Sequence, residues 1–283
     1  MTLGATDLVL CSGTLPFDAP LQTRLDAAVA GGFTGLSVWV RDVERARADG
    51  WSDADVRAIF ADRDIEIAEL DPVWSWLPGS DVEVPSSQDP MGVLQTKVDD
   101  FLGIADAIGG RSLNACDIMG GDWTLDDAAA AFAALCDRAA EHGLLVHLEF
   151  LPWSRIGDVA TAHEVVRRAD RPNGGVMIDS WHFFRGVPDF DALRAVPGQL
   201  VTGVQLSDAP RQPAPEPMRE SMDARLLPGD GECELARLTG VLDEIGAVAP
   251  RGVEVFSAPL RELDAVEVGR RAGEAMRALM RGA

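Results

Sequence analysis

The sequence predicts an eight-stranded β/α barrel, because short apolar runs alternate along the whole chain with alanine-rich stretches of helical spacing. Eight β-branched or apolar runs can be distinguished, and a helical pattern follows each of them. Strands that alternate with helices form parallel sheets through right-handed crossovers, and eight such units close into a barrel. No linker divides the chain, so we expect one domain over residues 1–283.

The expected strands and helices follow one another in strict alternation. The strands are Leu8–Leu15, Gly35–Val40, Ile65–Val73, Ser112–Ile118, Leu144–Leu151, Gly175–Asp179, Val201–Ser207 and Gly252–Ser257. The helical patterns cover about residues 20–31, 43–62, 93–109, 124–142, 158–169, 189–195, 233–247 and 262–281. Glycines stand where a helix must stop before the next strand, at Gly31-Gly32, Gly109-Gly110, Gly143 and Gly174-Gly175.

Two long segments follow predicted strands. Trp74–Met91 comes after the third strand, and the proline-rich Ala209–Glu232 comes after the seventh. Segments that follow strands lie at the C-terminal face of a barrel, where active sites are found. Long loops in a compact domain usually have a function, so we expect both segments to act as lids.

Composition excludes several classes of protein. The chain is 47% apolar and carries a net charge of -21, which favours a globular protein and disfavours nucleic acid as a partner. No apolar stretch is long enough to span a membrane. The start lacks the features of a secretory signal, so we expect a cytoplasmic protein. The four cysteines form no CxxC pair and are expected to be reduced thiols.

Four of the late strands carry a polar side chain near their ends. These residues are Glu149, Asp179, Gln205 and Glu254, within the runs LLVHLEFL, GGVMID, TGVQLSD and RGVEVF. A lone buried carboxylate is costly, and a single one usually pairs with an outer helix. Four oxygen donors, three carboxylates and one amide, on consecutive strands favour one divalent cation at the barrel axis. All-oxygen ligation suits Mn²⁺ or Mg²⁺, with Co²⁺ or Zn²⁺ as alternatives.

The segments HLEF, MIDSWH, VQLSD and VEVF resemble the metal-binding strands of the xylose-isomerase-like TIM barrels, the sugar phosphate isomerase/epimerase superfamily. The resemblance covers nearly the whole chain. It implies that Glu149, Asp179, Gln205 and Glu254 hold the metal, and that His182 of the pattern Asp-x-x-His lies beside it. DNA-repair endonucleases share this barrel, but four histidines in all and the acidic charge argue against that activity.

The sequence departs from the commonest pattern at Gln205, where many sugar isomerases have histidine. Gln205 and the downstream RLLPGDGE (Arg225–Glu232) are most similar to 3-dehydroshikimate dehydratase-like members. The resemblance therefore implies a metal-dependent lyase that dehydrates a cyclic keto acid such as 3-dehydroshikimate. The alternatives are a sugar or keto-sugar isomerase or epimerase, an inosose dehydratase, and a lyase acting on oxidised glycosides. Such barrels commonly form pairs, so the resemblance also allows a homo-oligomer.

These reactions all begin with loss of a proton next to a carbonyl, whose enolate a bound metal stabilises. Either Glu149 or Glu254 is then the candidate base. His182 is the candidate acid at a departing hydroxyl, or orients the substrate. His147 lies two residues before Glu149 and so shares its strand face. It is a second acid or base, an orienting partner, or a satisfied core histidine.

Further residues are candidates for contact with a small carbonyl or polyhydroxy substrate. Arg225 would clamp a carboxylate, unless it pairs with a nearby acid of its own loop, Asp230 or Glu232. Ser221, one helical turn earlier, could add a hydrogen bond. Glu69 on the third strand could meet substrate hydroxyls, or serve barrel packing instead.

Aromatic and basic residues narrow the substrate. Trp181 is one of six tryptophans at or just after strand ends, which either pack under loops or form the walls of a ring-binding pocket. The chain has no tyrosine, which excludes a tyrosine acid, and Lys97 is its only lysine. An open-chain sugar phosphate is therefore disfavoured relative to a cyclic keto acid, an inosose or an oxidised glycoside.

Overall fold

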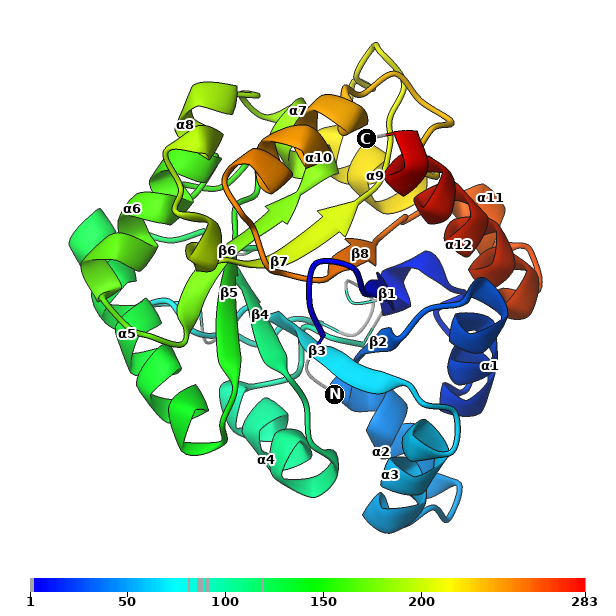
Figure 1. Ribbon diagram of the computed structural model, residues 1–283. Coiled ribbons are helices and arrows are strands. Elements are labelled where there is room, and N and C mark those ends of the chain that lie inside the picture. The colour runs from blue at the N-terminus through cyan, green and yellow to red at the C-terminus, as the bar shows by residue number, and fades with distance from the viewer. Residues whose placement is uncertain (1–2, 81, 86–88, 90–91, 119, 283) are drawn as a thin grey trace.

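The computed structural model contains a closed barrel of eight parallel strands in chain order, surrounded by helices (Figure 1). It describes residues 3–80, 82–85, 89, 92–118 and 120–282. Each strand pairs in parallel with the next, and the first closes on the last. The predicted fold class is confirmed. The strands are β1 (Leu8–Leu10), β2 (Gly35–Val38), β3 (Glu66–Val73), β4 (Ser112–Cys116), β5 (Leu145–Glu149), β6 (Gly174–Asp179), β7 (Val201–Leu206) and β8 (Arg251–Val253).

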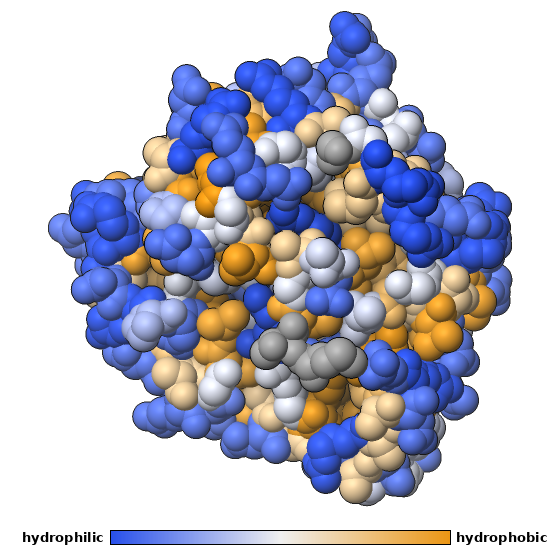
Figure 2. Space-filling view, in the orientation of Figure 1, coloured by the Kyte–Doolittle hydropathy of each residue, from blue (hydrophilic) through white to orange (hydrophobic). Residues whose placement is uncertain are grey.

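Helices form the outer layer of the barrel. Figure 2 shows hydrophilic residues mostly over these helices. Apolar residues of the strands and of the inner helix faces form a continuous buried core. Among the described residues, none of the helices combines the length and apolar character needed to cross a membrane. The helices are α1 (Leu21–Gly31), α2 (Val40–Ala48), α3 (Asp53–Ala61), α4 (Val98–Ile108), α5 (Leu125–Glu141), α6 (Val159–Ala169), α7 (Ser180–Arg185), α8 (Phe190–Arg194), α9 (Pro217–Asp223), α10 (Leu235–Glu244), α11 (Ala258–Arg261) and α12 (Ala265–Gly282).

The predicted helix over residues 43–62 is wrong as a single element, because it consists of α2 and α3. Gly50 adopts φ 93° between them, a conformation that stops a helix. Ser52 then begins α3, since its hydroxyl accepts a hydrogen bond from the backbone N–H of Asp55 at 3.2 Å. Both features stand in the sequence, but the continuous helical spacing concealed them.

The first and last predicted strands are shorter than expected. β1 ends at Leu10, and a 3₁₀ turn follows at Ser12–Thr14. The hydroxyl of Thr14 donates to the carbonyl of Val253 and accepts from the N–H of Val255, both at 3.0 Å. The carbonyl of Val253 also accepts from the N–H of Cys11. The N–H of Glu254 donates to the carbonyl of Leu206, so Glu254 is held just beyond the end of β8.

The glycines between helices and strands divide into two groups. Gly32, Gly109 and Gly143 adopt φ of 70°, 87° and 71°, which confirms the predicted helix stops. The expected turn at Gly174-Gly175 is wrong, because both residues belong to β6. There a side chain on Gly175 would overlap the hydroxyl of Thr202 on β7. This glycine makes room inside the barrel and does not end a helix.

The two long segments after β3 and β7 are described to different extents. Residues 81, 86–88, 90 and 91 of the first lie outside the described residues, and with them part of the lid expected over Trp74–Met91. The second segment contains the short helix α9, which the sequence analysis did not predict. Helices α7 and α11 were missed as well, because each is too short to show a helical period.

Close packing of α1 against α12 joins the two ends of the helical ring (Figure 1). Small residues permit this approach. A side chain on Gly273 of α12 would overlap the carbonyl oxygen of Gly31 in α1, and one on Gly269 would overlap that of Ala27. Backbone atoms cannot yield easily, so these two positions require glycine.

Replacing Gly273 by alanine tests this packing. We expect Gly273→Ala to lower the free energy of unfolding by about 1–3 kcal/mol, because an added methyl overpacks the interface. Gly103→Ala in α4 is the matched control, because no atom lies within 4 Å of the added carbon. It should stabilise by roughly 0.5–1 kcal/mol. Urea unfolding of both variants decides, and a neutral Gly273→Ala would contradict the packing.

Candidate active site

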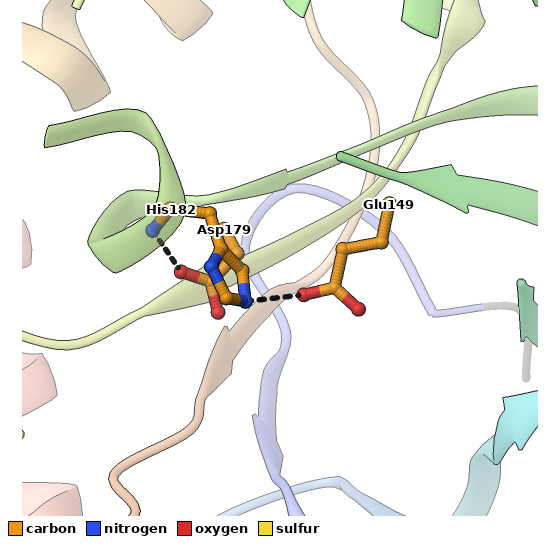
Figure 3. A group of neighbouring side chains, drawn as sticks. All are labelled: Glu149, Asp179 and His182. Atoms are coloured by element: carbon orange, nitrogen blue, oxygen red, sulfur yellow. Dashed lines mark hydrogen bonds and ion pairs between the residues drawn. The ribbon is translucent and has the colours of Figure 1, made fainter. Parts of the chain in front are cut away.

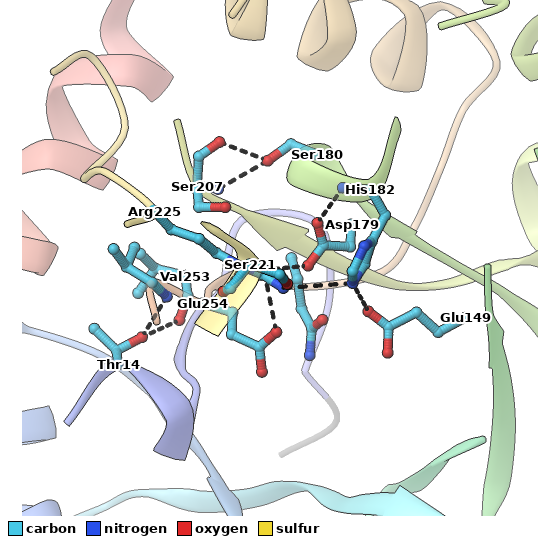
Figure 4. Close-up of polar contacts among 12 residues, drawn as sticks. Thr14, Glu149, Asp179, Ser180, His182, Ser207, Ser221, Arg225, Val253 and Glu254 are labelled. Carbon is cyan, nitrogen blue, oxygen red and sulfur yellow. Dashed lines mark hydrogen bonds and ion pairs between the residues drawn. The ribbon is translucent and has the colours of Figure 1, made fainter. Parts of the chain in front are cut away.

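The four predicted metal ligands lie at the C-terminal end of the barrel. Glu149, Asp179 and Gln205 are in the last two positions of β5, β6 and β7, and Glu254 directly follows β8. Asp179 and Gln205 are register partners on neighbouring strands. All four side chains are buried. Their strands face the barrel interior at these positions, so the acids of distant segments meet in one place (Figure 4).

His182 joins this group through the way α7 begins. Asp179 is the N-cap of α7, and its Oδ1 accepts a hydrogen bond from the backbone N–H of His182 at 3.0 Å. His182 Nε2 lies 3.4 Å from Glu149 Oε1 (Figure 3). Ligand atoms of these three residues lie within 4.8 Å of one another, a grouping that could hold a metal ion. The Asp-x-x-His spacing thus has a direct structural cause.

Arg225 lies among these carboxylates and comes from the segment that follows β7 (Figure 4). Its Nη1 donates to Asp179 Oδ2 at 2.7 Å and lies 3.5 Å from Glu254 Oε2. Its Nη2 contacts His182 Nε2 at 3.4 Å and donates to Ser221 Oγ at 3.0 Å. The alternative of a loop arginine paired with its own loop is not realised. The guanidinium instead contacts two residues proposed to bind the metal, and Ser221 contacts the guanidinium.

Gln205 turns one end of its amide away from the carboxylates. Its Nε2 donates to Glu69 Oε1 at 3.1 Å, and Glu69 Oε2 lies 3.3 Å from His147 Nε2. Gln205 Oε1 is buried and has no hydrogen-bond partner within the described part of the chain. Glu69 therefore contacts a proposed ligand from the N-terminal side of the site, and His147 contacts Glu69 in turn. Neither lines the cavity that opens at the C-terminal ends of the strands.

Burial dominates the electrostatics of the site. It raises the pKa of Glu149 to about 8, with the Asp179 carboxylate adding to the effect. Burial also raises the pKa of Glu254 well above its ordinary range, although Arg225 opposes this. For Asp179, burial raises the pKa, but Arg225 and His182 together outweigh it through their charges and hydrogen bonds, and the pKa falls. Burial lowers the pKa of His182 to about 3, which favours a neutral ring at pH 7 and an orienting or relaying role over a standing cationic acid.

The donor set fits a divalent metal ion. With every group ionised, Glu149, Asp179 and Glu254 carry three negative charges and Arg225 supplies one positive charge. Burying unbalanced charge is costly, and the two remaining negative charges are those that one divalent cation balances. The unpartnered Gln205 Oε1 adds an amide oxygen, which is a usual ligand of hard cations.

A cavity of about 330 Å³ opens beside the carboxylates. Cavities of roughly 300–1,000 Å³ hold small-molecule ligands, so this one suits a small substrate. Its polar residues include Asn114, Glu149, His182, Arg225 and Glu254, together with Ser221. Its remaining walls are mostly apolar and are formed by Trp39, Leu94, Ile118, Leu151, Trp153, Met218, Met222 and Phe256.

Trp181 has a different place from the one expected for a substrate wall. It is fully buried and is not among the residues that line the cavity. The Arg225 guanidinium lies 5.3 Å from its ring centroid, and the ring meets His182 edge to face at 5.3 Å. Trp181 therefore supports two polar residues from behind, while Trp39 and Trp153 reach the cavity itself.

Asp71 is a residue that the sequence analysis did not select. It lies on β3, lines the cavity, and has one carboxylate oxygen without a hydrogen-bond partner among the described residues. Burial raises its pKa to about 7, against hydrogen bonds from Ser37 and Trp39 that lower it. Its position on the face of Glu69 was the available signal. Asn114 on β4 lines the same cavity, and its amide donates to Glu149 Oε2 at 2.7 Å.

The chain matches the family model described as xylose isomerase-like TIM barrel over residues 25–281. It is 29% identical over 252 residues to the 3-dehydroshikimate dehydratase of Pseudomonas aeruginosa, covering 88% of this chain and 37% of that protein. It is 28% identical over 135 residues to the inosose isomerase of Bacillus subtilis, covering 47% of this chain and 48% of that protein. The chain spans about two fifths of the length of the dehydratases it matches.

A solved structure, the IOLI protein with a binding zinc atom, superposes with a TM-score of 0.82 at 19% identity and covers 97% of this chain and 98% of that one. At such identity the superposition speaks for the fold alone. The family model, in contrast, matches the sequence from the first helix of the barrel to the last. The chain therefore belongs to the xylose isomerase-like TIM barrel family.

Proposed function

We propose that this protein is a divalent-metal-dependent lyase that forms an enolate next to a substrate carbonyl and removes water from a cyclic keto acid of the 3-dehydroshikimate type. The observation that carries the proposal is the convergence of Glu149, Asp179 and Glu254 around Arg225 beside one cavity of substrate size. Relatives named as dehydratases and isomerases support the same class of reaction.

We assign the metal to Glu149, Asp179, Gln205 and Glu254. When bound there, a divalent cation would supply Lewis-acid stabilisation of an enolate oxygen. Mn²⁺ and Mg²⁺ suit this oxygen-rich set, and Zn²⁺ is an alternative that the zinc in a related fold supports. Arg225 contacts two of the same carboxylates, so the guanidinium and the cation share them.

The protein's own residues can move the proton that dehydration requires. Glu149 or Glu254 removes a proton from the carbon beside the carbonyl. From Glu149 that proton can pass to His182, whose Nε2 lies 3.4 Å from Glu149 Oε1. His182 then gives it to the hydroxyl that departs from the next carbon. The carbon–oxygen bond breaks, water leaves, and the carboxylate is regenerated without an external acid.

Arg225 and Ser221 are the proposed contacts for the carboxylate of a keto acid. Both line the cavity, and Ser221 Oγ accepts from Arg225 Nη2. In the structure the guanidinium is engaged by protein groups, so a substrate carboxylate would take over some of these contacts. Arg225 presents a planar fork of donors that suits a carboxylate.

The apolar upper wall of the cavity favours a second candidate function, elimination from an oxidised glycoside. Met218 and Met222 lie one turn apart on α9 and both line the cavity, as does Trp153. Methionine and tryptophan provide adaptable apolar surface for a ring. A polar keto ring at the carboxylates and an apolar ring against this wall would use both parts of the cavity.

The first test is dehydration of 3-dehydroshikimate by protein stripped with EDTA and then supplied with Mn²⁺ or Mg²⁺. We expect the aromatic product, 3,4-dihydroxybenzoate, to appear only with metal, because enolate formation needs a Lewis acid. Ultraviolet absorbance follows the product. Absence of product from protein that binds one ion per chain would exclude this substrate. Inososes and oxidised glycosides with aromatic groups would then be compared.

His182→Ala tests the proton route. We expect activity to fall about 10²-fold or more, because proton transfer at the departing hydroxyl is lost. Mn²⁺ affinity should change little, because the four assigned ligands remain. His142→Ala is the control, since His142 lies on the surface and pairs with Asp106. Unchanged activity in His182→Ala, or loss of the metal together with activity, would contradict the assigned role.

A further inference from the structure

A chain of polar contacts crosses the barrel interior on the N-terminal side of the proposed metal ligands. Gln205 Nε2 donates to Glu69 Oε1 at 3.1 Å, Glu69 Oε2 lies 3.3 Å from His147 Nε2, and His147 Nδ1 lies 2.8 Å from Thr202 Oγ1. These residues come from β3, β5 and β7. Glu69, His147 and Gln205 are buried. The network joins three strands and ends at one proposed ligand.

Glycines in the neighbouring strands make space for this network. A side chain on Gly175 would overlap Thr202 Oγ1, the group that contacts His147. A side chain on Gly203 would lie 2.5 Å from the end of Met177 and 3.1 Å from the His147 ring. Both contacts are tighter than normal packing allows. The positions of His147 and Thr202 therefore depend on two residues that have no side chain.

We propose that Glu69 and His147 are positioning residues that hold the Gln205 amide with its oxygen toward a divalent cation. The inference rests on the proposed metal site. Glu69 contacts His147 Nε2 through Oε2, at 3.3 Å, so Glu69 Oε1 is left to accept a hydrogen bond from the Gln205 amide nitrogen. Because nitrogen and oxygen diverge from one amide carbon, Oε1 is directed away from Glu69.

This orientation leaves the Gln205 amide oxygen without a partner, which is unfavourable unless a cation is present. Gln205 Oε1 is a buried acceptor without a donor among the described residues. Its register partner on β6 is Asp179, another acceptor. A freely turning amide would present its N–H₂ group to such carboxylates and form hydrogen bonds with them. Glu69 prevents that rotation, so the amide oxygen stays available as a metal ligand.

The test is Mn²⁺ affinity, measured by electron paramagnetic resonance of the free ion, in a double-mutant cycle. Glu69→Leu should weaken Mn²⁺ binding about tenfold or more when Gln205 is present, and by less than about twofold in a Gln205→Met background. Thermal unfolding of each variant without metal checks that it folds. An equal loss in both backgrounds would show that Glu69 does not act through Gln205.

Glu69→Gln separates positioning from charge. Its carbonyl can still accept from Gln205 and its amide can still donate to His147, so affinity should stay within about threefold of the wild type. A loss as large as that of Glu69→Leu would overturn the inference, and this comparison decides even if Gln205→Met binds no Mn²⁺. Wild-type protein that binds no Mn²⁺ overturns the inference and the metal site together. Inactivity with Mn²⁺ bound overturns only the proposed reaction.

Discussion

The arrangement at the C-terminal end of this barrel depends on the negative charge of three buried carboxylates. Glu149 and Asp179 end two neighbouring strands and Glu254 directly follows a third, so the backbone of the barrel holds the three carboxylates together. Burial, and after it their mutual repulsion, raises the pKa of Glu149 and Glu254, and Arg225 compensates only part of the charge. Burying a cluster of carboxylates at low dielectric constant is costly, and a bound cation that takes part in function offsets that cost. The proposed metal and the proposed enolate chemistry both follow from this imbalance.

The segment after β7 is folded so that it delivers Arg225 to the cluster. Asp208 accepts hydrogen bonds from the backbone N–H groups of Ala209, Gly229 and Cys233, at 2.8, 3.0 and 2.9 Å, and so gathers the RLLPGDGE turn. Trp181 then supports the guanidinium from behind. Asp208 and Trp181 therefore hold the turn and the guanidinium in the positions that place Arg225 among the carboxylates.

The barrel and its four candidate ligands could be predicted because both depend on local pattern. Alternating periods identify the strands, and the acids stand at strand ends, where a parallel barrel must bring them together. Contacts across the barrel could not be predicted in this way. The spacing left Glu69 as a contact for substrate or for barrel packing, and it contacts Gln205; it left Trp181 as a packing residue or a substrate wall, and it lies behind Arg225. Such roles depend on distances between strands, which residue spacing does not encode.

The proposed chemistry depends on one divalent cation bound among the buried carboxylates. Crystals grown with Mn²⁺ and measured at its absorption edge would locate that ion. We expect a single strong anomalous peak within ligand distance of oxygens from Glu149, Asp179, Gln205 and Glu254, at roughly 2.0–2.3 Å. No peak at that place, with Arg225 still bridging Asp179 and Glu254 at millimolar Mn²⁺, would contradict it.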